Sequence, residues 1–134
     1  MIWQHNKEKE MEVISTEKAP KALGPYSQAI KANGMIYCSG QIPIDPAVNA
    51  VTAETIEDQT RQAIANLGNV LEKAGSSLSK VVKTTVFISD MNEFARLNAV
   101  YAEMFGDTKP ARSCVQVARL PKDVKIEIEA TAEA

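Results

Sequence analysis

The last quarter of the chain alternates apolar residues with polar or charged ones, and this pattern limits the fold more than any other feature. Strand side chains point to opposite faces in turn, so the segments 110–117 and 124–130 both predict strands with one apolar face. The polar faces carry Arg112, Cys114 and Gln116 in the first segment and Lys125, Glu127 and Glu129 in the second. Two such strands can bring a guanidinium and a carboxylate to a common surface, which suits a small carboxylic acid.

Length and charge exclude several classes of protein. A chain of 134 residues with 45% hydrophobic content predicts one domain with a substantial core. A net charge of -2 and a pI near 5.5 argue against nucleic acid as the main partner. No apolar run is long enough for a membrane span, and the first ten residues are too polar for a signal peptide. We therefore expect a cytoplasmic protein with no membrane partner, made of a loose N-terminal extension (1–10) and a domain (11–134).

The remaining segments predict an α+β fold with the element order β-β-β-α-β-α-β-β. The first strands are expected at 12–15, 27–32 and 35–39, the last two joined by the hairpin signal Asn33-Gly34. A helix is expected from a Thr52 cap to about Ala74, then a strand at 81–89 and a second helix capped within 90–92. Right-handed crossovers place both helices on one face of a mixed six-stranded sheet. The uncovered face predicts self-association into a homo-oligomer.

The sequence also limits the possible chemistry. Its one histidine, His5, lies in the expected extension, which argues against His-based triads and metal sites. Cys38 and Cys114 each lie in a strand-like apolar run, so buried reduced thiols are favoured over a disulfide or a zinc site. Phosphate-loop and dinucleotide motifs are missing from the sequence. We expect a site without metal or cofactor, built from Arg, a carboxylate, Tyr, Ser, Cys and backbone groups.

Several short motifs, in order and spacing, resemble the RidA/YjgF family of reactive-intermediate (enamine/imine) deaminases from about Ile14 to Ala132. They are Ala22-Leu23-Gly24-Pro25-Tyr26-Ser27-Gln28-Ala29, Ser39-Gly40-Gln41-Ile42-Pro43, Asn98 with Tyr101, Pro110-Ala111-Arg112-Ser113-Cys114, Leu120-Pro121, and Ile126-Glu127-Ile128-Glu129. The resemblance implies a chorismate-mutase-like trimer with three sites in clefts between subunits. Such sites hydrolyse 2-imino acids, such as 2-iminopropanoate and 2-iminobutanoate, to 2-oxo acids and ammonia. The matching site positions are Tyr26, Ser39, Gly40, Arg112, Cys114 and Glu127.

The residues at those positions suit this chemistry. Arg112 can anchor the substrate carboxylate, and Glu127 can deprotonate the attacking water and later protonate the leaving amine. Ser39, Gly40 and Cys114 can offer hydroxyl and backbone donors to the tetrahedral adduct, and Tyr26 can wall the pocket. Cys114 is favoured as a packed residue over a nucleophile, since no histidine or metal is expected near it.

Other interpretations remain open from the sequence. Arg112 and Glu127 can form an ordinary cross-strand ion pair, and Glu129 shares the polar face of Glu127, so the choice between the two carboxylates depends on the resemblance. Asn98 and Tyr101 can be packing or interface residues. Two other functions compete with the deaminase: a trimer that binds 2-oxo acids without turnover, and an RNA-directed translation inhibitor.

Overall fold

The computed structural model describes residues 11–134, and the expected extension at 1–10 lies outside the described residues. Its strands are β1 (Glu12–Ile14), β2 (Ala29–Ala32), β3 (Met35–Gln41), β4 (Val81–Ile88), β5 (Ala111–Gln116) and β6 (Ile126–Glu133). Its helices are α2 (Ile56–Lys73) and α3 (Phe94–Phe105), with short 3-10 turns η1 (Leu78–Lys80), η2 (Met91–Glu93) and η3 (Pro121–Asp123). The predicted element order is confirmed.

The strands form one mixed sheet in the order β1-β2-β3-β6-β4-β5. β4 and β5 run parallel and are joined through α3, whereas the other pairs in the described part of the chain are antiparallel. The Asn33-Gly34 hairpin is confirmed, with φ values of 52° and 75° at its two turn residues. Both values suit the two-residue turn that matches strand twist, which Asn and Gly adopt at low cost.

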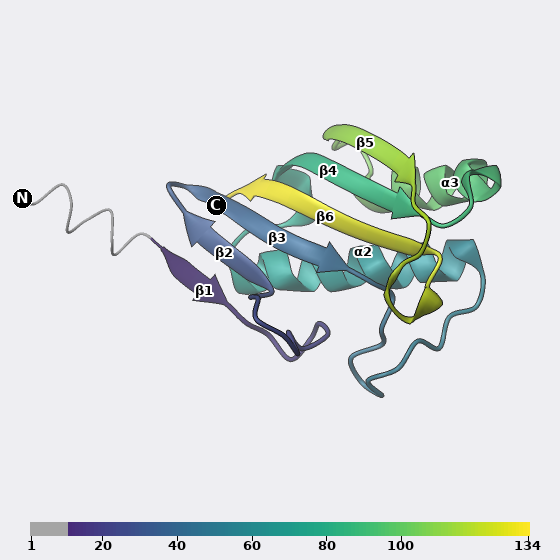
Figure 1. Ribbon diagram of the computed structural model, residues 1–134. Helices are drawn as coiled ribbons and strands as arrows, with labels where there is room; N and C mark the ends of the chain where they lie inside the picture. Colours follow the sequence, from purple (N-terminus) through teal and green to yellow (C-terminus); the bar gives the residue numbers. More distant parts are fainter. Residues whose placement is uncertain (1–10) are drawn as a thin grey trace, which may run out of the picture.

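Both helices lie behind the sheet in Figure 1, so the expectation of one uncovered sheet face is confirmed for residues 11–134. Side chains from the sheet and both helices fill the space between these layers, among them Ile36, Ile64, Leu67, Val86, Leu97, Ile126 and Ile128. The opposite sheet face leaves Tyr37 half-exposed (50%) and Val115 similarly open (45%). Exposed apolar side chains on a flat sheet face are typical of a surface that another subunit covers.

Several predicted boundaries were wrong. The second strand begins at Ala29 and not at 27, and the third ends at Gln41 and not at 39. The first helix begins at Ile56, because the Thr55 side chain, and not that of Thr52, accepts a hydrogen bond from the Asp58 backbone N–H (3.1 Å). The last strand runs from Ile126 to Glu133 and not from 124 to 130. It continues to Glu133 because β3 pairs with it as far as Met35↔Glu133.

Candidate active site

Arg112 is held against α3 by an amide and two aromatic rings. Its Nη1 donates to Asn98 Oδ1 at 2.7 Å, and its Cζ lies 4.7 Å from the centre of the Tyr101 ring. Phe94 lies on the same side, 5.4 Å from Cζ to ring centre. Such stacking orients a guanidinium without neutralising its charge. Arg112, Asn98 and Tyr101 also line a pocket of about 450 Å³ at the end of α3.

The charge of Arg112 is uncompensated by any carboxylate among residues 11–134. The other arginines each form ion pairs: Arg61 with Glu103, Arg96 with Glu57 and Glu93, and Arg119 with Asp123. The simple alternative, a cross-strand ion pair between Arg112 and Glu127, is therefore wrong within one chain. A guanidinium that faces a pocket and lacks a carboxylate partner is suited to bind a ligand carboxylate.

Cys114 lies two residues along β5 and packs partly against the core. Burial raises the pKa of its thiol, although the nearby charge of Arg112 opposes this, so the thiol is protonated at neutral pH. Val117 N–H donates to Ile88 O on β4. Because alternate residues of a parallel strand direct their amides to the same side, the Cys114 N–H points away from β4, at the open edge of the sheet. Cys38 is also a free thiol, and burial raises its pKa to about 12.

Glu127 lies on the uncovered face, directly over Gly40 of β3. A methyl group built at Gly40 would lie 2.8 Å from Glu127 Cδ and would overlap its carboxylate, so this close approach requires glycine. Burial, and secondarily the charge of Glu129, raises the pKa of Glu127. A partly buried carboxyl with a raised pKa is suited to exchange protons near neutral pH.

Ser39 lies beside Gly40, where the β3–β6 ladder is interrupted between Cys38 and Gln41. Its hydroxyl donates to Ser27 O (2.6 Å) and its backbone N–H donates to Gln28 O (2.9 Å). Both donors of Ser39 are thus used within the chain, and its hydroxyl oxygen remains able to accept. The role of Ser39 toward a ligand stays a prediction.

Tyr26 is 55% exposed and its backbone N–H donates to Gly24 O at 2.8 Å. It shares a pocket of about 190 Å³ with Gly40, Leu23, Lys21 and Lys122. The prediction that Tyr26 walls a pocket is thus consistent with its position. This pocket is separate from the one that Arg112 lines.

The predicted site residues therefore form two groups. We call Arg112, Asn98, Tyr101 and Cys114 the arginine half-site, and Tyr26, Ser39, Gly40 and Glu127 the glutamate half-site. Residues that pair in register on neighbouring strands point to the same face of the sheet. Arg112 pairs with Thr84, whose hydroxyl bonds to Tyr101 on the helix-covered face. Glu127 pairs with Phe87, which lies on the other face. The expectation that neighbouring strands bring guanidinium and carboxylate to one surface is wrong within a chain, because β4 separates β5 from β6 and the two side chains point to opposite faces.

Two residues of the arginine half-site were underestimated from the sequence. Asn98, which the sequence also allows as a packing or interface residue, bonds directly to Arg112. Phe94 is not among the predicted site residues, although it lies on the same side of Arg112 as Tyr101. The i, i+4 spacing of Phe94 and Asn98 on α3, with Tyr101 one turn further on, places all three side chains on one side of the helix. That spacing is the signal that could have grouped them.

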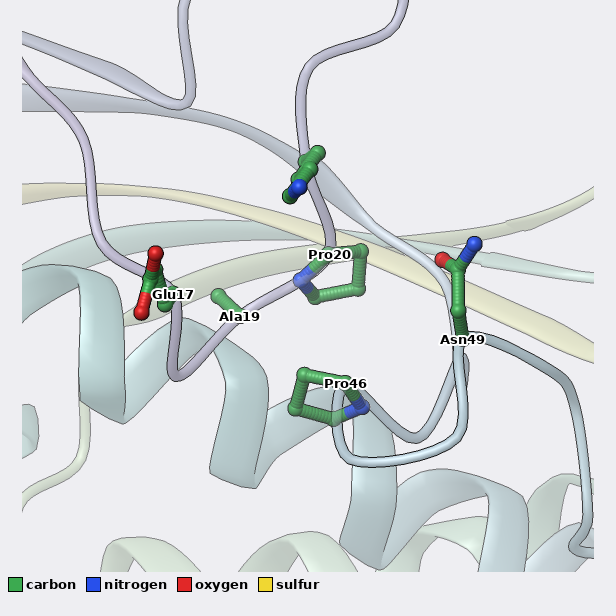
Figure 2. Close-up of a pocket in the computed structure, with 6 residues that line it drawn as sticks. Glu17, Ala19, Pro20, Pro46 and Asn49 are labelled. Carbon is green, nitrogen blue, oxygen red and sulfur yellow. The ribbon is translucent and has the colours of Figure 1, made fainter.

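Another pocket, of about 190 Å³, lies between the loop at 17–21 and the loop at 46–49. Figure 2 shows the rings of Pro20 and Pro46 facing each other there, with Ala19 and Asn49 beside them. No predicted site residue lines it. Among residues 11–134, no group of three or more His, Cys, Asp or Glu side chains is placed to hold a metal ion, and no described helix is long and apolar enough to cross a membrane.

Comparison with known proteins identifies the family. The sequence profile described as Endoribonuclease L-PSP matches residues 16–134. The chain belongs to this family, the RidA/YjgF family. It is 59% identical over 121 residues to a RutC family protein of Pyrococcus horikoshii, and the match covers 90% of this chain and 96% of that protein. It is 53% identical over 122 residues to a 2-iminobutanoate/2-iminopropanoate deaminase of Salmonella typhimurium (89% and 94%).

A solved structure extends the match to the fold. The crystal structure of E. coli TdcF with bound serine superimposes with a TM-score of 0.87 at 45% identity, covering 92% of this chain and 98% of that one. The RidA/YjgF resemblance is confirmed, as is the single α+β domain with a YjgF-like, chorismate-mutase-like fold.

Proposed function

We propose that this protein hydrolyses reactive 2-imino acids and their enamine forms to 2-oxo acids and ammonia. The observation that carries the proposal is the guanidinium of Arg112, which faces a pocket with no carboxylate partner among the described residues, in a chain 53% identical to a named imino-acid deaminase. A 2-imino acid presents the carboxylate that this group binds in two parallel charge-assisted hydrogen bonds.

The reaction adds water to the C=N carbon and then breaks the C–N bond. With the imine in its protonated form, Glu127 takes a proton from the attacking water as that oxygen bonds to carbon, and the same carboxyl then protonates the amine nitrogen of the adduct. The C–N bond breaks as ammonia leaves, and the hydroxyl of the adduct gives its proton to the Glu127 carboxylate as the C=O bond of the 2-oxo acid forms. The Cys114 N–H at the sheet edge is suited to bind the adduct, and its protonated thiol argues against a covalent intermediate.

The two half-sites must come from different copies of the chain, because one copy holds them on opposite faces of its sheet. We propose a homotrimer in which the arginine half-site of one subunit meets the glutamate half-site of the next. Three equivalent contacts close a ring and cover all three open sheet faces. The exposed Tyr37 and Val115 on that face support such an assembly.

A coupled assay tests the proposed reaction. A pyridoxal-phosphate dehydratase acting on serine releases 2-aminoacrylate, which becomes 2-iminopropanoate, and pyruvate and ammonia are followed with and without the protein. Release above the spontaneous rate is expected. Binding of pyruvate with no acceleration would instead identify a 2-oxo acid-binding protein.

An RNA-directed function, suggested by the family description, has less support from this chain. Three of its arginines are paired with carboxylates, and the net charge is -2. Binding of nucleic acid depends mainly on unpaired basic groups and weakens with salt. Salt-sensitive RNA binding at micromolar protein concentration would support this alternative.

Replacing Val115 by Asp is expected to break the assembly. The substitution puts a charge on the uncovered face, opposite Phe87, where a subunit contact would desolvate it without a partner. Light scattering should show a trimer for the unmodified protein and smaller or unfolded species for Val115→Asp. Val48→Asp, on an exposed loop away from the sheet, is the matched control and should remain a trimer. A stable monomer from the unmodified chain would remove the shared site.

Replacing Gly40 by Ala is expected to displace Glu127, because the added methyl group takes the space of its carboxylate. Misplacing a reacting group by about 1 Å can cost roughly 100-fold, and we expect kcat to fall by about tenfold or more. Gly68→Ala in α2 is the control, since its methyl group meets Leu78 at an ordinary 3.4 Å. Unchanged kcat in Gly40→Ala would show that Glu127 is not needed at this position.

A further inference from the structure

Thr84 carries a hydroxyl into the apolar layer between the sheet and α3. The residue is fully buried in the middle of β4 and pairs in register with Arg112 on β5. A buried hydroxyl costs free energy unless it is hydrogen-bonded. The Thr84 Oγ1 shares a hydrogen bond of 2.8 Å with the phenolic oxygen of Tyr101.

That hydrogen bond fixes the ring on which Arg112 rests. The Tyr101 ring lies 4.7 Å from Arg112 Cζ on one side and 4.5 Å from the Phe105 ring on another. Burial raises the pKa of Tyr101, so its hydroxyl stays protonated at neutral pH and keeps the bond to Thr84. Without this bond, packing against Phe105 and the other core side chains would hold the ring alone, and the position of the ring beneath the guanidinium would be less closely fixed.

Arg112 is thus oriented from two directions. Asn98 fixes one nitrogen of the guanidinium through a hydrogen bond, and the Tyr101 ring fixes its plane. A planar fork binds a carboxylate with both nitrogens only when its plane is correctly set, so the plane matters for affinity as much as the charge.

We propose that Thr84, acting through Tyr101, is a positioning residue that sets the plane of the Arg112 guanidinium for the substrate carboxylate. This inference rests on the proposed function for the identity of the ligand, but the positioning itself is measurable without turnover. Neither residue contacts the reacting C=N bond in this scheme; both act on the carboxylate anchor.

The test is Thr84→Val, which keeps the side-chain shape and removes the hydroxyl. Tyr101→Phe removes the other partner and keeps the ring, and Thr84→Ser restores the hydroxyl. Thr60→Val is the matched control: Thr60 is also fully buried, with its hydroxyl bonded to Ile56 O at 2.7 Å, but it lies in α2 away from Arg112. Thermal unfolding and light scattering establish that each variant is folded and assembled.

Calorimetric titration with pyruvate should show affinity weakened about five- to tenfold in Thr84→Val and Tyr101→Phe, the loss expected from one misaligned hydrogen bond. Thr84→Ser should recover most of it, and Thr60→Val should bind as the unmodified protein does. In the deaminase assay the loss should appear in KM with kcat nearly unchanged, because the anchor binds substrate and transition state alike.

A second measurement separates positioning from general stability. In protein labelled with ¹⁵N-arginine, the Nε–H signal of Arg112, identified by its loss in Arg112→Ala, should shift in Thr84→Val, while the signals of Arg61, Arg96 and Arg119 stay in place. Unchanged pyruvate affinity and an unchanged Arg112 signal would overturn the proposal, as would an equal effect of Thr60→Val. If the signal and affinity change but no variant or parent shows turnover, the positioning role stands and the deaminase proposal fails.

Discussion

Arg112→Ala is expected to lower kcat/KM for 2-iminopropanoate by at least about 100-fold while the protein stays folded and assembled. Each charge-assisted hydrogen bond contributes about 1.5–3 kcal/mol, and about 1.4 kcal/mol corresponds to a factor of ten. The side chain has no carboxylate partner among residues 11–134, so its removal leaves no buried charge unpaired. The coupled pyruvate and ammonia assay measures the loss, and thermal unfolding measures the stability.

Two further variants sharpen this result. Arg112→Lys keeps the charge but loses the planar fork and its stacking on Tyr101, so it should recover little activity. Arg61→Ala removes an exposed arginine that pairs with Glu103, and it should leave activity unchanged. Near-normal kcat/KM in Arg112→Ala would show that another group anchors the carboxylate.

The sequence predicted the local features of the fold because each has a short-range physical cause. The Asn33-Gly34 turn follows from the ease with which these residues adopt positive φ. The faces of β5 and β6 follow from alternation, which correctly separated Val115 from Arg112 and Glu127 from Ile128. The uncovered face follows from right-handed crossovers that carry both helices to one side.

What the sequence could not predict depends on the order of strands and on contacts distant along the chain. The alternation of side chains groups the residues of one strand into two faces. It does not determine which of those faces lies on the same side of the sheet as a given face of another strand. In the structure β5 turns Arg112 toward α3, whereas β6 turns Ile126 and Ile128 toward the helices, so Arg112 and Glu127 lie on opposite faces. The hydrogen bonds of Ser39 to Ser27 and Gln28 have the same origin, since the strand interruption at Cys38–Gln41 has no local signal.

The separation of the half-sites has a chemical consequence. A single chain presents the proposed carboxylate anchor, Arg112, without a base nearby, and it holds Glu127 in a partly buried position without an anchor for substrate. Activity in the proposed trimer is then linked to assembly, because hydrolysis needs both halves in one cleft. Binding of a 2-oxo acid and turnover of an imino acid are therefore separable properties. Variants of the arginine half-site test binding, and variants of the glutamate half-site test turnover.

Glu127→Gln is expected to lower kcat by roughly 100- to 10,000-fold, the range that a positioned acid–base group contributes, while pyruvate still binds through Arg112. The amide keeps the shape that packs over Gly40, but it can neither accept the proton of the attacking water nor return one to the amine. Calorimetric titration with pyruvate, beside the ammonia-release assay, measures both halves of this expectation. Turnover that persists in Glu127→Gln would remove Glu127 from the mechanism.

Glu129→Gln is the matched variant, since Glu129 lies two residues further along β6 and contributes to the raised pKa of Glu127. As the base, Glu127 must be ionised, so kcat should fall as the pH drops through its pKa, and the raised pKa places this fall at a higher pH than for an ordinary glutamate. Removing the charge of Glu129 lowers that pKa, so the acid limb should move to lower pH while the plateau of kcat is kept. A large loss of kcat in Glu129→Gln, with an active Glu127→Gln, would instead assign the base to Glu129.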